Sequence, residues 1–561
     1  MSIRLMDTTT LQMRVFVGES IPKYAILSHT WVEDEEVNFQ EMTAIACDRR
    51  RPATLKSGYR KILSTCEKAR RHNINYVWVD TCCIDKSSSA ELSEAINSMF
   101  KWYRNAEVCY VFLSDLEPES YVELAMKSCR WFKRGWTLQE LIAPEYLRFY
   151  NRNWEFVGTK SELSSTVCAI TGVDQVVLTD CTFLPGIPVA RRMFWASQRT
   201  TTRTEDLTYC LLGIFDVNMP LLYGEGDKAF IRLQEEIIKR SNDLSIFWSF
   251  PSTSAADLHE RKYLRDYLCR DLFATAPRDF SKSGDIFPDY LHSGHIRDFA
   301  LTNNGIRFVN AEFKIVQKLG DYPSCYYAMD LQHFDPGWSF CQMVLQKIGP
   351  SLFVRCALSL EECRALYRDS VARSVCCAAE DAYIVSKNSA FIEHRRDTSR
   401  HYAISFQIDS CIERQKEYFY PVIEAPTPCE NWNAAHQEFI TMGKPFQGYV
   451  SLLLRDKYSS SSGTYCYLAF SLILSDSHTL DPKYCLRLLE PNDLEKHQAR
   501  STRGLGLTTL LIKHPGQRQK TEDQLVLDGV AFAARFEVAD DRDYPSYRIT
   551  IRFEHHPNSA I

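Results

Sequence analysis

The stretch from Ser128 to Leu141, with the sequence SCRWFKRGWTLQEL, combines one carboxylate with aromatic rings and positive charge. Trp136 and Glu140 are four residues apart, so they share one face if the stretch is helical. Gly135 precedes this helix, and three cations surround its start: Arg130, Lys133 and Arg134. Backbone amides and cations beside an acid can hold an anionic ligand next to a reactive carboxylate. The stretch therefore predicts a site centred on Glu140.

An amphipathic helix without chemistry explains the same stretch. Trp136, Leu138 and Leu141 would then lie in the core, and Glu140 would face solvent, as most charged side chains do. The two interpretations differ in where Glu140 points, and that depends on the elements around it.

Short apolar runs alternate with helical patterns over the first 150 residues, which is typical of a parallel α/β sheet. We predict strands at 24–28, 76–80, 108–113 and 146–150. Helices are predicted over 55–69, after Gly135, and after Ser88, whose spacing to Glu91 is that of a capping box. Right-handed crossovers then place helices on both faces of the sheet.

Polar residues follow the predicted strands at the points where they end. Ligands of open parallel sheets bind beyond the carboxyl ends of the strands. Those ends carry the residues Ser28, His29, Thr30, Trp31, Asp80, Thr81, Ser114 and Asp115. We expect a site at this edge, with Glu140 on a later helix of the same unit.

Length and composition exclude several classes of protein. A chain of 561 residues exceeds the usual size of one hydrophobic core, so we expect two or three domains. A net charge of -5 argues against a nucleic-acid-binding protein. The longest apolar run, around 465–474, is too short to span a membrane, and the first residues lack the apolar run of a signal peptide.

The 20 cysteines are spread along the chain and include no C-x-x-C pair. We therefore predict a reducing, cytoplasmic location and no metal site. Cys82 and Cys83 are expected to be small buried residues at a strand end, not nucleophiles. Ser28 and His29 are neighbours on a strand, so they point to opposite faces and do not form a catalytic pair.

Downstream of the predicted sheet the pattern is first helical and then alternating. We predict helices over 190–199, 205–215 and 227–240, a boundary at 251–257, and a mainly β region over 260–561. Turn signals in that region include Asn304-Gly305, Asp335-Pro336-Gly337 and the Ser459 to Ser462 run. Gly224-Glu225-Gly226 is similar to part of a phosphate loop, but a turn before the next helix fits it better.

Four blocks of this chain resemble the fungal heterokaryon incompatibility (HET) domain. They are YAILSHTW (24–31), YVWVDTCCIDK (76–86), SCRWFKRGWTLQEL (128–141) and RTEDLTYCLLGIFDVNMPLLYGEG (203–226). The blocks are long and ordered, so the resemblance is specific for about residues 20–245. One departure is Val32, where the family usually has glycine. The resemblance implies a HET domain over 1–250, with an α/β core over about 20–150 and a helical extension over about 151–250.

HET domains are in turn similar to TIR domains, which implies a TIR-like or flavodoxin-like parallel sheet. Several TIR proteins cleave NAD with a glutamate in a W-C-x-x-E-L pattern, which Trp136, Glu140 and Leu141 match, with Thr137 in place of cysteine. The resemblance thus implies that Glu140 is catalytic. We expect substrate-binding roles for Ser28, Trp31, Asp80, Arg130, Arg134 and Trp136, with the arginines pairing with the pyrophosphate and a tryptophan stacking on a base.

Two functions stay open. The first is a programmed cell death effector in non-self recognition that hydrolyses NAD or a related nucleotide, NAD being a substrate and no cofactor being needed. The second is a non-catalytic signalling module that self-associates or binds a recognition partner protein. In either case we expect no nucleic acid and no membrane span, and a β-rich C-terminal region that senses a trigger or restrains the N-terminal domain.

Overall fold

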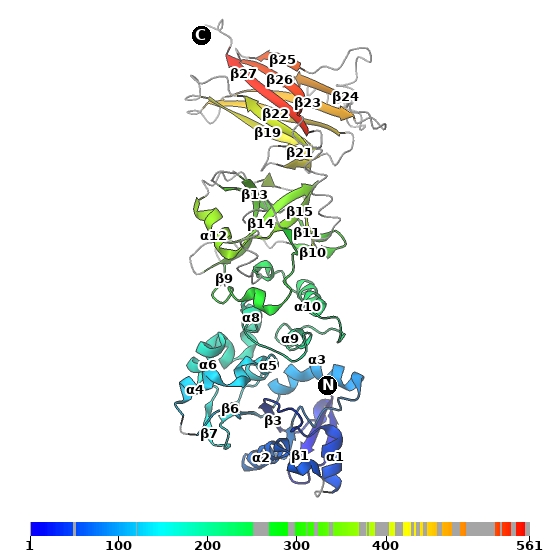
Figure 1. The fold of residues 1–561 in the computed structure, drawn as a ribbon, viewed down its shortest axis with the longest axis vertical. Helices are drawn as coiled ribbons and strands as arrows, with labels where there is room; N and C mark the ends of the chain where they lie inside the picture. Colours follow the sequence, from blue (N-terminus) through cyan, green and yellow to red (C-terminus); the bar gives the residue numbers. More distant parts are fainter. Residues whose placement is uncertain are drawn as a thin grey trace. The chain divides into compact units, whose positions relative to one another are not determined.

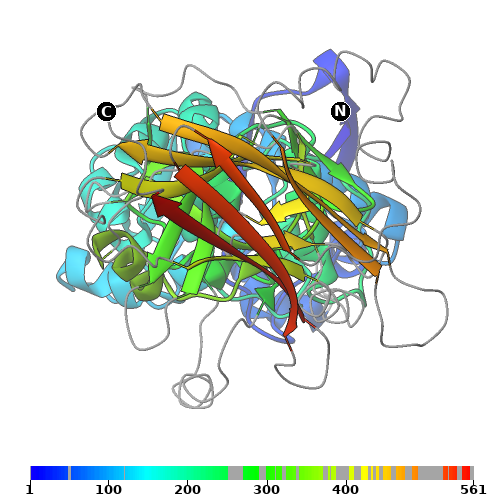
Figure 2. The same ribbon diagram turned by 90° about the horizontal axis from the view of Figure 1, so that it is seen from above.

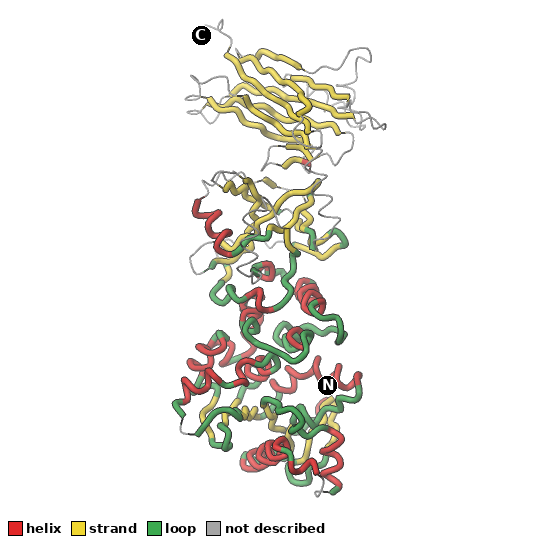
Figure 3. The backbone as a smooth tube through the Cα atoms, viewed as in Figure 1, coloured by secondary structure: helices red, strands yellow, loops and turns green. Residues whose placement is uncertain are grey.

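The computed structural model describes residues 2–48, 52–118, 120–250, 269–289, 298–309, 311–318, 324–335, 340–369, 377–378, 381–386, 403–409, 419–427, 431–433, 438–440, 446–456, 463–473, 483–489, 522–527, 530–539 and 546–555. The chain divides into two compact units. Unit 1 comprises 1–265, 273–296 and 331–341, and unit 2 comprises 266–272, 297–330 and 342–561. Figures 1 and 3 show their helices and strands, and each unit is described by itself.

Unit 1 contains a seven-stranded sheet with the order β2-β1-β4-β3-β5-β6-β7. The strands are β1 (Ser2–Asp7), β2 (Met13–Val17), β3 (Tyr24–His29), β4 (Tyr76–Trp78), β5 (Val108–Phe112), β6 (Leu147–Tyr150) and β7 (Phe156–Thr159). The central strands β4, β3, β5 and β6 are parallel, whereas the β1–β2 hairpin and β7 add antiparallel strands at the two edges. The four predicted strands are confirmed, and the mixed α/β fold with a parallel sheet is as expected.

The order of the parallel strands, 2-1-3-4 in chain order, is that of doubly wound sheets. In such sheets the connections leave in opposite directions between the first and third strands, here β3 and β5, which opens a crevice at their carboxyl ends. Ser28 pairs with Val111 and His29 with Phe112 at this point. Every residue of β3 and β5 is buried, as expected for strands covered on both faces.

The helical segments that connect these strands include α1 (Phe39–Cys47), α2 (Ser57–Arg71), α3 (Ser89–Arg104), α4 (Val122–Ser128), the 3-10 turn η3 (Arg130–Lys133) and α5 (Thr137–Ile142). Helix α2 packs on β3 and β4, whereas α5 packs on β3 and α3. Figure 1 shows α2 and α5 on opposite sides of β3. The predicted capping box forms in half, because Ser88 Oγ accepts from the Glu91 amide while the Glu91 carboxylate pairs with Arg4.

The rest of unit 1 is mainly helical, as predicted. It includes α6 (Ser164–Thr171), α7 (Gln175–Thr179), η4 (Cys181–Gly186), α8 (Val189–Phe194), α9 (Asp206–Tyr209), α10 (Lys228–Ile238), η5 (Leu244–Phe247) and η6 (Pro277–Phe280). The prediction of long helices over 190–199 and 205–215 is wrong in length. The chain leaves α8 early because Thr200 pairs with the turn before α5. It leaves α9 early where Gly213 packs directly on Phe100.

Unit 1 continues past the predicted boundary at 251–257, which lies outside the described residues. The Gln234 side chain in α10 donates to the Ala274 carbonyl (2.8 Å) and accepts from the Ala274 amide (3.0 Å). His333 also lies 3.5 Å from Asp243. The N-terminal unit therefore includes segments that the sequence placed in the β-rich region.

Unit 2 is mainly β, as predicted (Figure 3). Residues 269–384 contribute to a sheet with the order β10-β11-β17-β15-β14-β13-β12-β16, with β8 and β9 beside it. Its strands are β8 (Cys269–Arg270), β10 (Phe299–Thr302), β11 (Gly305–Val309), β12 (Glu312–Lys318), β13 (Ser324–Phe334), β14 (Phe340–Gly349), β15 (Leu352–Cys356), β16 (Cys377–Ala378) and β17 (Asp381–Ile384). The short β9 (Phe287–Pro288) pairs with the end of β13 that belongs to unit 1, and the described residues of this region include the helix α12 (Leu360–Asp369). The predicted turn at Asn304 joins β10 to β11, and Gly305 has the positive φ (115°) that this turn requires.

The last ten strands form two sheets around one core. One sheet has the order β20-β21-β18-β27-β26-β25 and the other the order β19-β22-β23-β24. The strands are β18 (Ala403–Asp409), β19 (Phe419–Thr427), β20 (Trp432–Asn433), β21 (Glu438–Ile440), β22 (Phe446–Asp456), β23 (Gly463–Ile473), β24 (Lys483–Leu489), β25 (Glu522–Leu527), β26 (Val530–Ala539) and β27 (Ser546–His555), seen from above in Figure 2. Their inward side chains, such as Ile404, Phe532 and Leu452, share one buried cluster. The predicted turns at 336–337 and 459–462 lie outside the described residues.

No helix in the described part of the chain combines the length and apolar character needed to span a bilayer.

Candidate functional site

Helix α5 places Glu140 against β3 in the interior of unit 1. The Ser28 hydroxyl donates a hydrogen bond to Glu140 Oε2 and accepts one from Trp131 Nε1 at 2.7 Å. Glu140 is 5% exposed, Ser28 is fully buried, and all six residues of α5 are buried. The alternative in which Glu140 faces solvent is therefore wrong, because α5 is packed on all sides and not amphipathic.

The turn before α5 is held in place by the helical extension. Gly135 donates to the Thr200 carbonyl at 2.9 Å, and Thr200 donates to the Lys133 carbonyl at 2.7 Å. A Cβ atom on Gly135 would lie 2.5 Å from Cγ2 of Thr201, so only glycine fits this close approach. Two chain segments more than 60 residues apart thus fix the position from which Glu140 reaches Ser28.

Burial raises the pKa of Glu140 to about 8, and the negative charge of Asp80 adds to this effect. The hydrogen bond from Ser28, the charge of Arg134 and the Tyr103 hydroxyl act in the opposite direction but do not compensate. Most Glu140 carboxyls are therefore protonated at neutral pH in this arrangement. The side chain is a neutral acid in a closed environment.

The opposite face of β3 carries a network of charged groups around His29. Nε2 of His29 lies 3.0 Å from Asp80 Oδ1, and Nδ1 lies 3.0 Å from Lys61 Nζ. An ammonium can only donate, so Nδ1 accepts from Lys61 and Nε2–H donates to Asp80. Lys61, which is buried, also pairs with the Glu36 carboxylate and donates to the Thr30 carbonyl.

Asp80 remains charged although it is part of a buried cluster. Burial alone would raise the pKa of Asp80, but hydrogen bonds from His29 and Trp31 and the charge of Lys86 outweigh burial, so the pKa is lowered. Nε1 of Trp31 donates to Asp80 Oδ2 at 2.9 Å. The Lys86 ammonium lies 3.7 Å from the centroid of the Trp31 ring. A base can stack on that face of Trp31 only if Lys86 moves.

The three remaining predicted binding residues lie in different surroundings. Arg130 is exposed at the carboxyl end of β5, with Nε 3.4 Å from Asp115 and Nη2 3.4 Å from the Ser114 hydroxyl. Arg134 is half-buried and lowers the pKa of Glu140 by its charge. Burial raises the pKa of the Asp206 carboxyl, and Trp136, also half-buried, lies beside this carboxyl and acts in the opposite direction. The structure thus brings Ser28 to Glu140 directly, and Trp31 to Asp80, but directs Trp136 to the helical extension.

Several residues of this region were not predicted from the sequence. Arg199 is 5% exposed and donates to the Arg134 carbonyl (2.8 Å) and the Thr137 hydroxyl (3.0 Å), which fixes the first turn of α5. Burial lowers the pKa of Arg199 to about 10. Lys61 could have been found, because it is a cation on the otherwise apolar face of the predicted helix over 55–69. The sequence pattern around Arg199 gives no signal that this residue belongs to the site region.

The glycine turn at Gly224 and Gly226 is occupied by the protein itself. The amides of both glycines donate to Oε1 of Glu205, at 2.8 Å and 3.0 Å. These hydrogen bonds lower the pKa of Glu205. A carboxylate thus takes the position that a phosphate would occupy in a phosphate loop, and the expected role as a turn before α10 is confirmed. Cys82 and Cys83 are buried, as predicted.

Comparison with known proteins locates the similarity in unit 1. Residues 24–130 match the model of the family described as heterokaryon incompatibility protein (HET). The chain is 47% identical over 228 residues to vegetative incompatibility protein HET-E-1 of Podospora anserina, a match that covers 39% of this chain and 16% of that protein. No solved structure matches the chain significantly. Residues 24–130 thus belong to a heterokaryon incompatibility (HET) domain.

Proposed function

We propose that this chain is an effector of heterokaryon incompatibility, which leads to programmed cell death when incompatible fungal cells fuse. The observation that carries the proposal is the 47% identity over 228 residues to a protein named for vegetative incompatibility. The matched region spans less than a fifth of that relative, so the proposal concerns the HET domain as the effector part.

For the mode of action we propose hydrolysis of NAD or a related nucleotide, with Glu140 as the catalytic carboxylate. Nicotinamide leaves NAD as a neutral ring, so the reaction requires no general acid. One carboxylate can stabilise the oxocarbenium-like transition state and orient the attacking water. Support comes from the position of Glu140 beside Ser28, near the carboxyl end of β3 and the crevice between β3 and β5.

This mechanism requires an ionised Glu140, whereas the closed arrangement favours the protonated form. The positively charged nicotinamide ribosyl group would lower the pKa of a nearby carboxyl, because an opposite charge favours the ionised form. We therefore propose that the arrangement described above is the resting state. Substrate binding or self-association would then open the contact between Ser28 and Glu140 and expose the carboxylate.

The test is NAD loss catalysed by the full chain, measured by chromatography at high protein concentration, where self-association is favoured. Glu140→Gln should lower the rate about a hundredfold or more, since it removes the charge at the reacting centre. Glu123→Gln changes an exposed glutamate on α4 and serves as the matched control. Equal rates for the wild type and Glu140→Gln, or no NAD loss from either, would count against catalysis by this residue.

A non-catalytic module that self-associates is the second candidate. The observation in its favour is that Glu140 is nearly inaccessible and already bonded to Ser28, as a purely structural residue would be. Expression of the Glu140→Gln variant in cells distinguishes the two candidate functions. If Glu140→Gln still causes cell death while cellular NAD stays constant, the module is supported and the enzyme is rejected.

A further inference from the structure

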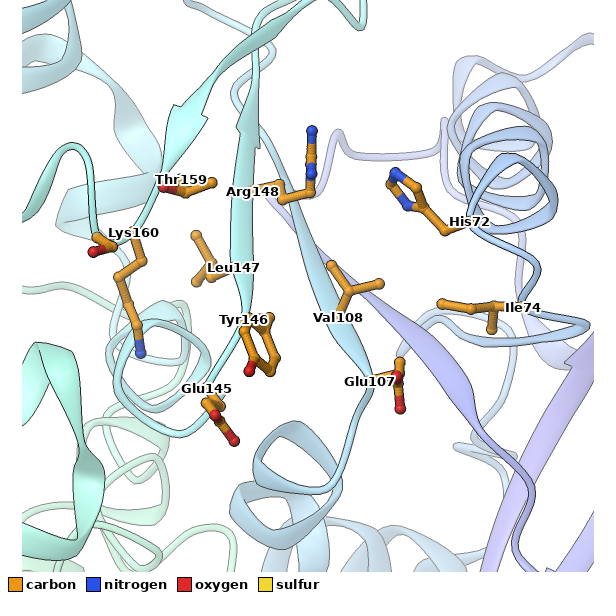
Figure 4. Close-up of a pocket in the computed structure, with 11 residues that line it drawn as sticks. His72, Ile74, Glu107, Val108, Glu145, Tyr146, Leu147, Arg148, Thr159 and Lys160 are labelled. Carbon is orange, nitrogen blue, oxygen red and sulfur yellow. The ribbon is translucent and has the colours of Figure 1, made fainter.

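A pocket of about 360 Å³ lies at the edge of the unit 1 sheet opposite to Glu140, where β5 and β6 begin. Figure 4 shows His72 and Arg148 at one end of this pocket and Glu107 and Glu145 at the other. Val108 and Leu147 form its apolar part. The volume is within the range of sites that bind small molecules.

Arg148 lines the basic end of the pocket, and Lys68 lies beside it, since both act on His72 by their charge. Nζ of Lys68, on α2, lies 5.0 Å from the ring centroid of Tyr150. The guanidinium carbon of Arg148, on β6, lies 4.3 Å from the ring centroid of Phe156. These two ring centroids are 6.0 Å apart, so the two cations lie over neighbouring rings.

His72 adds a third basic group to this end of the pocket. Its Nδ1 is 2.5 Å from the Tyr110 hydroxyl oxygen, and the Tyr110 and Tyr150 rings lie 5.8 Å apart. When the hydroxyl donates to Nδ1, the ring carries its proton on Nε2, which can donate to a ligand. His72 is exposed, so a ligand can reach it.

The basic groups repel one another. Burial and the charges of Arg148 and Lys68 lower the pKa of His72, and burial and the charges of Arg71 and Arg148 lower the pKa of Lys68. The dipole at the C-terminus of α2 favours nearby cations, yet the pKa values of His72 and Lys68 are still lowered.

The acids of the pocket do not neutralise this end. Glu107 is 2.9 Å from Lys23, and Glu145 is hydrogen-bonded to Tyr146. Within the described ranges, neither Lys68 nor Arg148 forms an ion pair with a carboxylate. Glu67 acts on Lys68, and Glu162 interacts with Arg148, by charge at longer range and without such an ion pair.

We propose that Lys68, His72 and Arg148 bind a small phosphate-bearing molecule in this pocket. The phosphate oxygens would accept hydrogen bonds from all three groups and remove their mutual repulsion. The pocket is larger than a phosphate ion, so an organic group of the ligand would lie against Val108, Leu147 and the ring of Tyr146. This site is separate from Glu140 and does not depend on the proposed NAD hydrolysis.

The test is binding of inorganic pyrophosphate to the full chain, measured by calorimetry at low ionic strength. Arg148→Gln should weaken binding about tenfold or more, and Lys68→Gln severalfold, because each removes a charged donor. Arg152→Gln is the matched control, since Arg152 is a surface arginine paired with Glu117, and its affinity should equal that of the wild type.

A second measurement uses sulfate, whose charge does not change near neutral pH. The groups that face His72 are Lys68, Arg148 and Tyr110, and Glu107 lines the same pocket. An anion favours the protonated imidazole, so sulfate should bind more tightly at about pH 5.5 than at about pH 8. His72→Gln should reduce this pH dependence, and the remainder comes from Lys160, which lines the same pocket and whose pKa burial lowers to about 8.

Three results would overturn the proposal: no pyrophosphate binding at millimolar concentration, equal affinity for Arg148→Gln and the wild type, or an equal loss in Arg152→Gln. The last result would mean that the anion binds by general surface charge. If thermal melting shows that Arg148→Gln is unfolded, Lys68→Gln decides, because Lys68 is half-buried on the surface of α2.

Discussion

Two neighbouring residues of β3 hold acids in opposite states of charge. On one face Ser28 bonds to Glu140, whose pKa is raised to about 8 by burial. On the other face His29 bonds to Asp80, whose pKa is lowered although burial opposes this. The difference lies in the partners. Glu140 has a neutral hydroxyl, whereas Asp80 has an imidazole, an indole and the nearby ammonium of Lys86. Burial alone thus does not decide which acid is charged.

Among the substitutions that test this comparison, removal of Lys61 should have the largest effect on the stability of unit 1. Lys61→Ala leaves the Glu36 carboxylate without its buried partner, and we expect a loss of about 3–5 kcal/mol in the free energy of unfolding of unit 1. Because the chain has two compact units, hydrogen exchange of the β3 amides is the appropriate measurement. Lys56→Ala is the control, since its half-exposed pair with Glu41 should contribute less than about 1 kcal/mol. Equal losses would show that the buried network adds nothing.

The pH dependence of stability should differ between the two acids. Glu140 has its ordinary pKa of 4.5 when unfolded and about 8 when folded, so the unfolded state binds fewer protons between these values. Its contribution to stability should therefore fall, on the order of a few kcal/mol, as the pH rises from about 4.5 to 8. The pKa of Asp80 is lowered on folding, so its contribution is lost only as the pH falls below its ordinary value of 3.8.

Glu140→Gln should remove the fall in stability that the Glu140 carboxyl causes as the pH rises. The variant should gain stability relative to the wild type between about pH 5 and pH 8, as measured by hydrogen exchange or by denaturation at each pH. A stability difference that stays constant over this range would show that the Glu140 carboxyl has an ordinary pKa in the folded chain.

Replacement of each acid by its amide should change the free energy of unfolding by different amounts at about pH 5. At this pH Glu140 is protonated in the folded chain and partly protonated in the unfolded chain. Glu140→Gln should then change the free energy of unfolding by less than about 1 kcal/mol. Asp80→Asn should cost about 2 kcal/mol, because it replaces a charged acceptor of two hydrogen bonds. Similar costs for both amides would contradict the assignment of opposite charge states.

Trp31→Phe should have the smallest effect. It removes the indole N–H that donates to Asp80 but keeps an aromatic ring beneath Lys86. Because Trp31 is 40% exposed, we expect a loss below about 1 kcal/mol in a thermal or denaturant melt. A larger loss would show that Trp31 contributes more to keeping Asp80 charged than its exposure indicates.

The sequence predicted the parallel strands because their apolar runs are short, continuous and bounded by turn signals. It did not predict the β1–β2 hairpin, although Ile3 and Leu5 alternate with polar residues in β1. Helices such as α2 and α3 were predicted because their apolar residues recur at helical spacing. The ends of α8 and α9 could not be predicted, since they are set by the pairing of Thr200 and the packing of Gly213 on Phe100.

The candidate site was predicted only in part, for a physical reason. Glu140 and Ser28 were named from local patterns, but their contact joins residues 112 positions apart, and no local pattern contains it. The direction of Trp136 toward Asp206 and the role of Arg199 likewise depend on the helical extension. The roles of Glu140 and the six predicted binding residues in catalysis and binding remain predictions.

The pairing of Thr200 with the turn at Lys133 and Gly135 limits how short a fragment of this protein can be and still fold independently. A fragment that stops at residue 130, the limit of the family match, lacks Glu140 altogether. A fragment that stops at residue 150 keeps Glu140. It lacks Thr200, which pairs with the turn before α5, and Arg199, whose guanidinium hydrogen-bonds to Thr137 in that helix. Ala274 is the hydrogen-bond partner of Gln234, so a fragment must extend at least to residue 274 to keep this contact. We expect shorter fragments to misfold.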